Sequence, residues 1–249
     1  MSEVTTKIYD TKSEASKYVA SELAKKITEN NDKGLTTVLG LATGSSPIDM
    51  YQELIRFHQE EGLSFKNVIT FNLDEYMPMS HDSEKSYHYF MDHNLFNHID
   101  IDKSNVHVPS GDLQENEVKA YCEDYEKKIA DAGGLDIQIL GIGRTGHVGF
   151  NEPGSAENSI TRMVILNKVT VADAAPDFGG ADKVPTKAIT MGVSTIMKAR
   201  KVYLMAWGEK KAGIVKESLE KAISDQVPAT YLQKHSNVEY VLDKGAAGV

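Results

Sequence analysis

The chain has 249 residues, of which 41% are hydrophobic and 25% are charged, as is typical of a soluble globular protein with a buried core. Its formal net charge of −9 argues against a nucleic-acid or anionic-membrane partner, because such surfaces need clustered Lys and Arg. Cys122 is the single cysteine, which excludes an intrachain disulfide and a cysteine-based metal site.

The rest of the composition favours one cytoplasmic domain. The first thirty residues do not have the pattern of a secretory signal, and no apolar run reaches the ~18 residues that suggest a membrane span. Internal repeats, low-complexity tracts and Pro/Ser linkers are absent from the sequence. We therefore expect a single continuous domain over residues 1–249.

The first half of the chain predicts two helices and two strands. A capping box at Thr11–Glu14 opens the first helix. The buried face of this helix is predicted to consist of Ala15, Val19, Leu23 and Ile27. Residues 36–41 are a short apolar run of strand type, residues 47–62 a second helix from Pro47 to Gly62, and residues 68–73 a second strand.

The second half continues the alternation of strands and helices. Residues 117–132 form an amphipathic helix, residues 135–140 a strand, and residues 202–207 and 238–242 two more strands with a helix over 210–222 between them. This order predicts an α/β fold with three αβα layers and a largely parallel sheet. Residues 172–184 show neither the apolar period of a helix nor the alternation of a strand. We therefore expect a long loop there, within a lid-like segment at about 160–184.

Two strand ends carry residues suited to a ligand site. After the first strand, Thr43-Gly-Ser-Ser-Pro47 combines small residues with a helix start, where free N–H groups and the helix dipole favour an anion such as phosphate. The alternative is an ordinary N-cap by Ser45 or Ser46. After the second strand, Asp74 and Glu75 provide carboxylates for proton transfer. The alternative is a turn begun by Asp74 with Glu75 in solvent.

The third strand end, Gly141–Pro153, contains Gly141, Gly143 and Gly146 in a G-x-G-x-x-G pattern. A dinucleotide-binding interpretation fails, because no long helix opens at the third glycine and no acidic residue ends the next plausible strand, residues 161–166. His147 and Glu152 are instead a candidate pair for proton transfer, against the alternative of a structural loop histidine. The sequence lacks metal-ligand spacing, so we expect no metal.

At these residues the chain closely resembles the glucosamine-6-phosphate deaminase (isomerase) family, from about residue 35 to residue 243. The matching pieces, in family order, are residues 41–47, 71–76, 86–87, 146–153 and 208–211. The sister 6-phosphogluconolactonases share the fold and a glycine–histidine loop, but they lack the acid of the Phe150–Pro153 segment. The resemblance implies a modified Rossmann-like fold and a cofactor-free conversion of glucosamine 6-phosphate to fructose 6-phosphate and ammonia.

The resemblance also assigns roles to residues. Asp74 is expected to move a proton from C2 to C1 of the open-chain sugar, and His147 to open the ring with Glu152 holding it. The expected contacts of the phosphorylated amino sugar are Thr43, Gly44, Ser45, Ser46, Tyr87, Gly146 and Lys211. The oligomeric state is left open, with a homo-oligomer among the states considered.

Two departures from the family pattern stand out. Thr145 occupies a position where the family usually has Asp or Asn, so we expect retained activity with an altered pH profile. The lid segment 172–178 lacks the family's phosphate-binding arginine, which leaves Lys211 as the main expected cation. Val164 and Ile165 stand where regulated members carry activator-binding polar residues, so no such regulation is expected.

Two alternatives remain beside glucosamine 6-phosphate deamination. One is an isomerase or deaminase of galactosamine 6-phosphate or another hexose phosphate, suggested by the altered lid. The other is a non-catalytic sugar-phosphate sensor, disfavoured because Asp74, His147 and Glu152 are all present and no helix-turn-helix extension is apparent.

Overall fold

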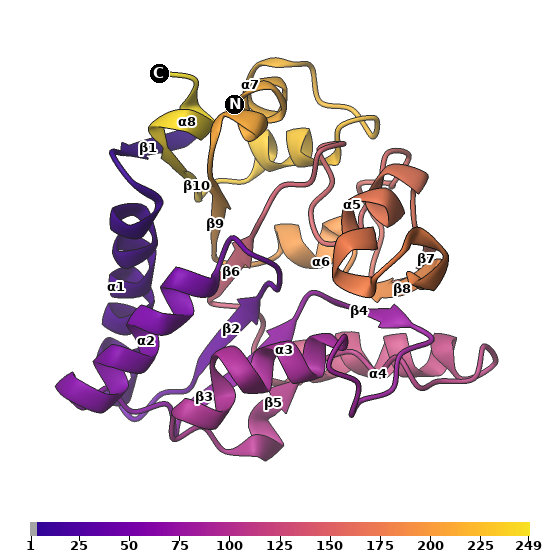
Figure 1. Cartoon of the computed structure of the whole chain (residues 1–249). Coiled ribbons are helices and arrows are strands. Elements are labelled where there is room, and N and C mark those ends of the chain that lie inside the picture. Colours follow the sequence, from indigo (N-terminus) through magenta and orange to yellow (C-terminus); the bar gives the residue numbers. More distant parts are fainter. Residues whose placement is uncertain (1–3) are drawn as a thin grey trace.

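A seven-stranded parallel sheet forms the centre of the molecule, which is described by a computed structural model covering residues 4–249 (Figure 1). Its strands lie in the order β1-β10-β9-β6-β2-β3-β5. Their bounds are Thr5–Tyr9 (β1), Val238–Asp243 (β10), Lys201–Ala206 (β9), Ile137–Leu140 (β6), Thr37–Leu41 (β2), Val68–Asn72 (β3) and Val106–His107 (β5). The predicted α/β fold with a largely parallel sheet is confirmed, whereas β1 and β5 were not predicted.

Helices surround the central sheet and a second, smaller sheet (Figure 1). They are α1 (Lys12–Asn31), α2 (Ile48–Glu61), α3 (Tyr87–Asn94), α4 (Val118–Asp131), α5 (Lys168–Phe178), α6 (Val193–Met197), α7 (Ala212–Glu220) and α8 (Lys244–Ala247). Short 3₁₀ turns lie at Phe96–His98, Lys103–Asn105, Ala181–Lys183, Glu209–Lys211 and Pro228–Lys234. Within residues 4–249, no helix is both long enough and apolar enough to cross a bilayer.

The predicted helix signals account for α1. Thr11 and Glu14 form the reciprocal capping box, which satisfies backbone N–H groups that the first turn leaves unpaired. The apolar stripe then packs into the main core, with Ala15, Val19, Leu23 and Ile27 all fully buried. Full burial of each large apolar side chain contributes about 1.5–3 kcal/mol to stability. α1 lies against α2 on one side of the sheet (Figure 1).

A second, smaller sheet was not predicted. It contains β4 (Asp74–Met77), β8 (Lys187–Thr190) and β7 (Arg162–Ile165), in the order β4-β8-β7 with antiparallel pairing. It packs with α5 around a separate apolar cluster that includes Tyr76, Phe150 and Ala188. β4 and β8 have only four residues each, so period-2 alternation is too short to mark them in the sequence, whereas β7 lies within the plausible strand at residues 161–166.

The expectation of a long loop over residues 172–184 is wrong. Residues 168–178 form α5, which begins at an N-cap by Asn167 and ends at Gly179, whose φ of 73° suits glycine. Thr170 is the one buried residue of this helix, so the sequence shows no apolar period there. Pro176 lies in the last turn, and a proline normally argues against a helix. The segment at about 160–184 therefore contains β7 and α5 rather than a structureless lid.

Candidate functional site

The cleft lies where the order of the strands reverses. β2 and β6 are neighbours in the sheet, but the chain continues from β2 to β3 on one side and from β6 towards β9 on the other. The loops that leave the carboxyl ends of these two strands therefore diverge, which is where open α/β sheets bind ligands. The cleft is lined by Ala42, Thr43, Gly44, Ser45, Ser46, Leu73, Asp74, Tyr87, Gly141, Ile142, Gly143, His147, Gly149 and Phe150.

The loop after β2 is fixed at both ends and open in the middle. The Tyr51 hydroxyl donates to the Ala42 carbonyl, and the Trp207 indole donates to the Ser46 carbonyl at 2.9 Å. Between these anchors, Gly44 adopts a φ of 83°, in the left-handed region that favours glycine. Gly44 and its neighbour Ser45 are exposed, so a ligand can reach their backbone N–H groups.

The alternative N-cap interpretation of Ser45 and Ser46 is wrong. α2 begins at Ile48 with Pro47 in the cap position, and no side chain of the described residues caps the helix. The N–H groups of its first turn are therefore not occupied by a side-chain cap. A helix start with free donors attracts negative charge, so the loop and helix together suit a phosphate group.

Asp74 is the first residue of β4 and enters the cleft from the opposite wall. Its side chain is buried, with a residue exposure of 6%, and it accepts no side-chain hydrogen bond from any residue in 4–249. Burial, helped by the adjacent charge of Glu75, raises the pKa of Asp74 well above its usual value. A carboxyl group in this state binds a proton readily and can return it to a substrate atom.

Glu75 points away from solvent, so the predicted alternative of a turn with a solvated Glu75 is wrong. Its carboxylate accepts the N–H groups of Tyr76, Tyr87 and His88, which ties β4 to the start of α3. Burial nevertheless raises the pKa of Glu75 to about 7, because the three donors only partly offset the loss of solvent. Through this contact Glu75 positions Tyr87, which lines the cleft.

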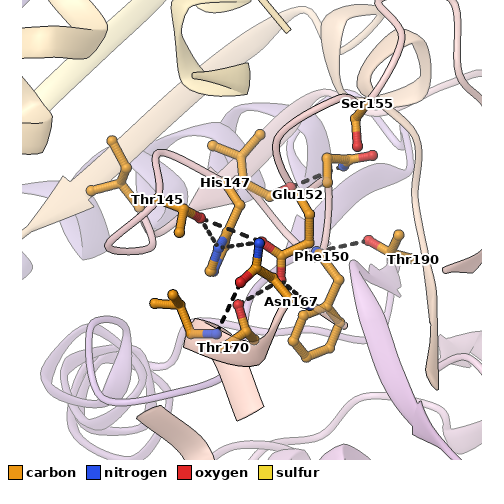
Figure 2. A network of polar contacts seen from close by, with 12 residues as sticks. Thr145, His147, Phe150, Glu152, Ser155, Asn167, Thr170 and Thr190 are labelled. Atoms are coloured by element: carbon orange, nitrogen blue, oxygen red, sulfur yellow. Dashed lines mark hydrogen bonds and ion pairs between the residues drawn. The ribbon is translucent and has the colours of Figure 1, made fainter. Parts of the chain in front are cut away.

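His147 stands at the centre of a polar network (Figure 2). Its Nδ1 lies 2.9 Å from the Thr145 hydroxyl and 3.2 Å from Oε2 of Glu152, and the Thr145 hydroxyl lies 3.3 Å from the same Oε2. An ionised carboxylate can only accept, so Nδ1 is the ring nitrogen that donates, which leaves Nε2 for other partners. The ring lines the cleft, where it can exchange a proton with a bound molecule.

Glu152 lies between His147 on one side and Asn167 and Thr170 on the other (Figure 2). Its Oε1 accepts the hydroxyl of Thr170 and the backbone N–H of Asn167, both at the start of that helix. Burial alone would raise the pKa of Glu152, but the hydrogen bonds from His147, Thr170 and Asn167 outweigh it and hold the pKa below its usual value. Glu152 is therefore ionised, and the helix dipole of α5 adds to its stabilisation.

The glycines of this loop have packing roles. A Cβ on Gly143 would lie 2.0 Å from Nε2 of His147, and a Cβ on Gly149 would lie 2.9 Å from the Thr190 hydroxyl and 3.4 Å from a carboxylate oxygen of Asp74. Gly146 has a φ of 78° and packs against Val227 rather than lining the cleft. The G-x-G-x-x-G pattern thus reflects close approach of side chains.

Of the predicted site residues, the structure brings Thr43, Gly44, Ser45, Ser46, Asp74, Tyr87 and His147 around one cleft, with Glu152 directly behind His147. Lys211 lies beside the cleft, where its ammonium group donates to the Ile142 carbonyl at 2.6 Å. Burial lowers the pKa of Lys211, with the positive charge of Arg144 acting in the same direction and Asp173 opposing it. Ile142 itself lines the cleft.

Sequence reasoning missed the residues that support Glu152. Thr170 and Asn167 hold its second oxygen, and Arg144 joins the His147 loop to Asp173 of α5 at 3.0 Å. The one available signal was Asn167, a favoured N-cap residue, which would have indicated a helix start. The residues after Asn167 lack an apolar period, so this signal alone does not predict a helix.

Comparison with known proteins defines the family. Residues 10–241 match the model of the glucosamine-6-phosphate isomerases/6-phosphogluconolactonase family. The chain belongs to this family. It is 48% identical over 236 residues to a glucosamine-6-phosphate deaminase of Thermoanaerobacter pseudethanolicus, covering 95% of this chain and 91% of the relative. It is also 47% identical over 244 residues to the glucosamine-6-phosphate deaminase of Clostridium perfringens, covering 98% and 97%.

Another relative is much longer than this chain. A putative glucosamine-6-phosphate deaminase-like protein of Bacteroides thetaiotaomicron is 45% identical over 247 residues, which are 99% of this chain but 37% of the relative. The chain therefore spans little more than a third of that protein.

Solved structures agree with this family. A monomeric glucosamine-6-phosphate deaminase superposes with a TM-score of 0.94 at 42% identity, covering 98% of this chain and 99% of that one. The 6-phosphogluconolactonase of Trypanosoma brucei shares the fold, with a TM-score of 0.79 at 22% identity.

Proposed function

We propose that the chain converts glucosamine 6-phosphate and water to fructose 6-phosphate and ammonia without a cofactor. The observation that carries the proposal is the meeting of Asp74 and His147 across one cleft beside an open, anion-binding loop. Their positions provide two separate proton-transfer groups for two separate steps. The names of the family relatives support the choice of substrate, and a sugar phosphate as substrate supports a cytoplasmic location.

In this proposal the phosphate binds the N–H groups of residues 43–46 near Lys211, which orients the sugar towards His147 and Asp74. Nε2 of His147 exchanges a proton with the ring oxygen and the C1 hydroxyl, so the ring opens to the aldehyde. Glu152 keeps Nδ1 protonated and favours the imidazolium form while His147 holds the extra proton.

Asp74 then takes the C2 proton and returns it to C1, while O1 gains a proton and the nitrogen loses one, which moves the double bond to C2 as an imine. Water adds at C2 and ammonia leaves, giving the ketose. The raised pKa of Asp74 suits the group that must hold the proton between the two carbons. A protonated amine on C2 would lower that pKa by its opposite charge and so ionise Asp74 when the amino sugar binds.

The test is incubation of the purified protein with glucosamine 6-phosphate, with ammonia and fructose 6-phosphate measured in the same samples. Equal amounts of both products are expected. A parallel incubation with galactosamine 6-phosphate measures the preference for the C4 epimer. Tight sugar-phosphate binding without ammonia release would reject the enzyme and favour the sensor. The oligomeric state, which the resemblance leaves open, can be measured on the same sample by sedimentation.

A further inference from the structure

Two charged side chains bridge the His147 loop and α5 beside the cleft. Arg144 follows Gly143, which lines the cleft, and precedes Thr145, which contacts His147. Its guanidinium lies 3.0 Å from a carboxylate oxygen of Asp173 on α5. Both side chains are well exposed, at 64% and 47%, and exposed ion pairs of this kind contribute only about 0–1 kcal/mol. Arg144 can therefore exchange Asp173 for a stronger anion at little cost.

The surroundings of Arg144 suit an anion with two charges. The charges of Arg144 and Asp173 both act on the pKa of Lys211, so the three side chains are near one another. The ammonium group of Lys211 contacts the carbonyl of Ile142, two residues before Arg144. The same loop approaches the anion-binding loop directly, since a Cβ on Gly141 would lie 3.7 Å from the Ser46 hydroxyl oxygen. Lys211 and Arg144 thus lie within electrostatic range of each other, Arg144 on a loop that approaches residues 43–46, and Asp173 neutralises Arg144.

We propose that Arg144 is a second cationic ligand of the substrate phosphate, and that Asp173 holds its guanidinium while the cleft is empty. The inference rests on the proposed function in that the ligand is a sugar phosphate. A guanidinium presents two parallel N–H groups that match two phosphate oxygens, and a phosphate dianion competes well with a single exposed carboxylate. Asp173 is then a competitor of the substrate, and its removal improves binding.

The test compares the variants R144Q and D173N, because a ligand and its competitor should have opposite effects on the affinity for phosphate. Binding of inorganic phosphate and of fructose 6-phosphate is measured by calorimetry at low ionic strength. We expect R144Q to weaken both by about tenfold, which corresponds to about 1.4 kcal/mol, and D173N to strengthen both. R144K should fall between the wild type and R144Q, because it keeps the charge and loses the paired donors.

The matched control is R200Q. Arg200 pairs with Asp136 at 3.2 Å and is 59% exposed, but it lies at the other end of the strands, next to the start of β6 and β9. We expect R200Q to bind phosphate as the wild type does. Unchanged binding in R144Q, weaker binding in D173N, or no phosphate binding by the wild type would each overturn the assignment.

The binding probes keep this inference separate from the proposed reaction. If the wild type releases no ammonia but R144Q weakens and D173N strengthens phosphate binding, the proposed reaction is wrong and the role of Arg144 holds. If ammonia is released and R144Q retains the wild-type KM and the wild-type inhibition by phosphate, the role of Arg144 alone is wrong.

Discussion

Asp74 and Glu152 are both buried acids of the same site, yet their environments differ. Within residues 4–249, Asp74 receives no side-chain hydrogen bond and lies next to a second acid, whereas Glu152 is held by His147, Thr145 and the first turn of α5. The pKa of Asp74 is raised well above its usual value and that of Glu152 is lowered. Burial alone therefore does not decide the charge of an acid, because hydrogen-bond donors can reverse its effect.

The largest expected effect is that of D74N on turnover. An amide cannot carry the proton between C2 and C1, so kcat should fall by about 10²–10⁴-fold, the usual contribution of a positioned base. Stability should be unchanged or higher, because the site already favours an uncharged group. Ammonia release and thermal unfolding measured on one preparation test both parts, and a D74N variant with wild-type kcat would remove Asp74 from the mechanism.

E152Q should give the opposite result for stability. Glutamine has one acceptor oxygen in place of two and cannot balance a charged His147, so we expect kcat to fall by about 10²-fold and the folded state to lose about 1–3 kcal/mol. Because the folded pKa of Glu152 lies below its unfolded value, its contribution to stability is present above the unfolded pKa and is lost as pH falls through the folded pKa.

Urea unfolding of the wild type and E152Q across the acid range measures this contribution. The difference between the two proteins should be largest near neutral pH and shrink on acidification. A constant difference, or one that grows at low pH, would show that Glu152 is not held as a charged group.

E75Q tests the influence of the second acid on Asp74. Removal of the Glu75 charge lowers the pKa of Asp74, so the acidic limb of the pH profile of kcat/KM should move to lower pH. Because the pKa of Glu75 is about 7 in the folded protein and its reference value is 4.5, the wild type should lose about 3 kcal/mol relative to E75Q as pH rises through that interval. An unmoved acidic limb would mean that the two acids are not coupled.

The smallest effect is expected for T145D. The added charge lies within hydrogen-bond distance of Nδ1 of His147, where it favours the imidazolium form, and it also faces Glu152. The pH–rate curve should move to higher pH with little change in its maximum. T145S keeps the hydroxyl and is the matched control. An unmoved curve for T145D would count against any role for this position.

Local patterns made much of the fold and cleft predictable. Apolar runs marked β2, β3, β6, β9 and β10, and the residues that follow β2, β3 and β6 were recognised as candidates because Gly, Ser, Asp and His are unusual together at strand ends. Carboxyl ends of neighbouring parallel strands meet at one edge, so the meeting of Asp74 and His147 followed from topology.

The remaining features depend on contacts between distant residues. β4 pairs with β8 across more than a hundred residues, and neither strand is long enough to have a period of its own. The support of Glu152 by Thr170 required recognition of α5, which is stabilised by its caps and by packing on Phe150 and Tyr76 rather than by an apolar stripe. No local pattern in the sequence contains that information.

The contact between Glu152 and the start of α5 has a thermodynamic consequence. The hydrogen bonds from Asn167 and Thr170 lower the pKa of Glu152, so by linkage the ionised carboxylate must favour the docked helix by the same free energy. A proton added to Glu152 weakens the attachment of α5, and any displacement of α5 makes Glu152 harder to ionise. The proton equilibrium of the site and the position of this helix are therefore reciprocal quantities.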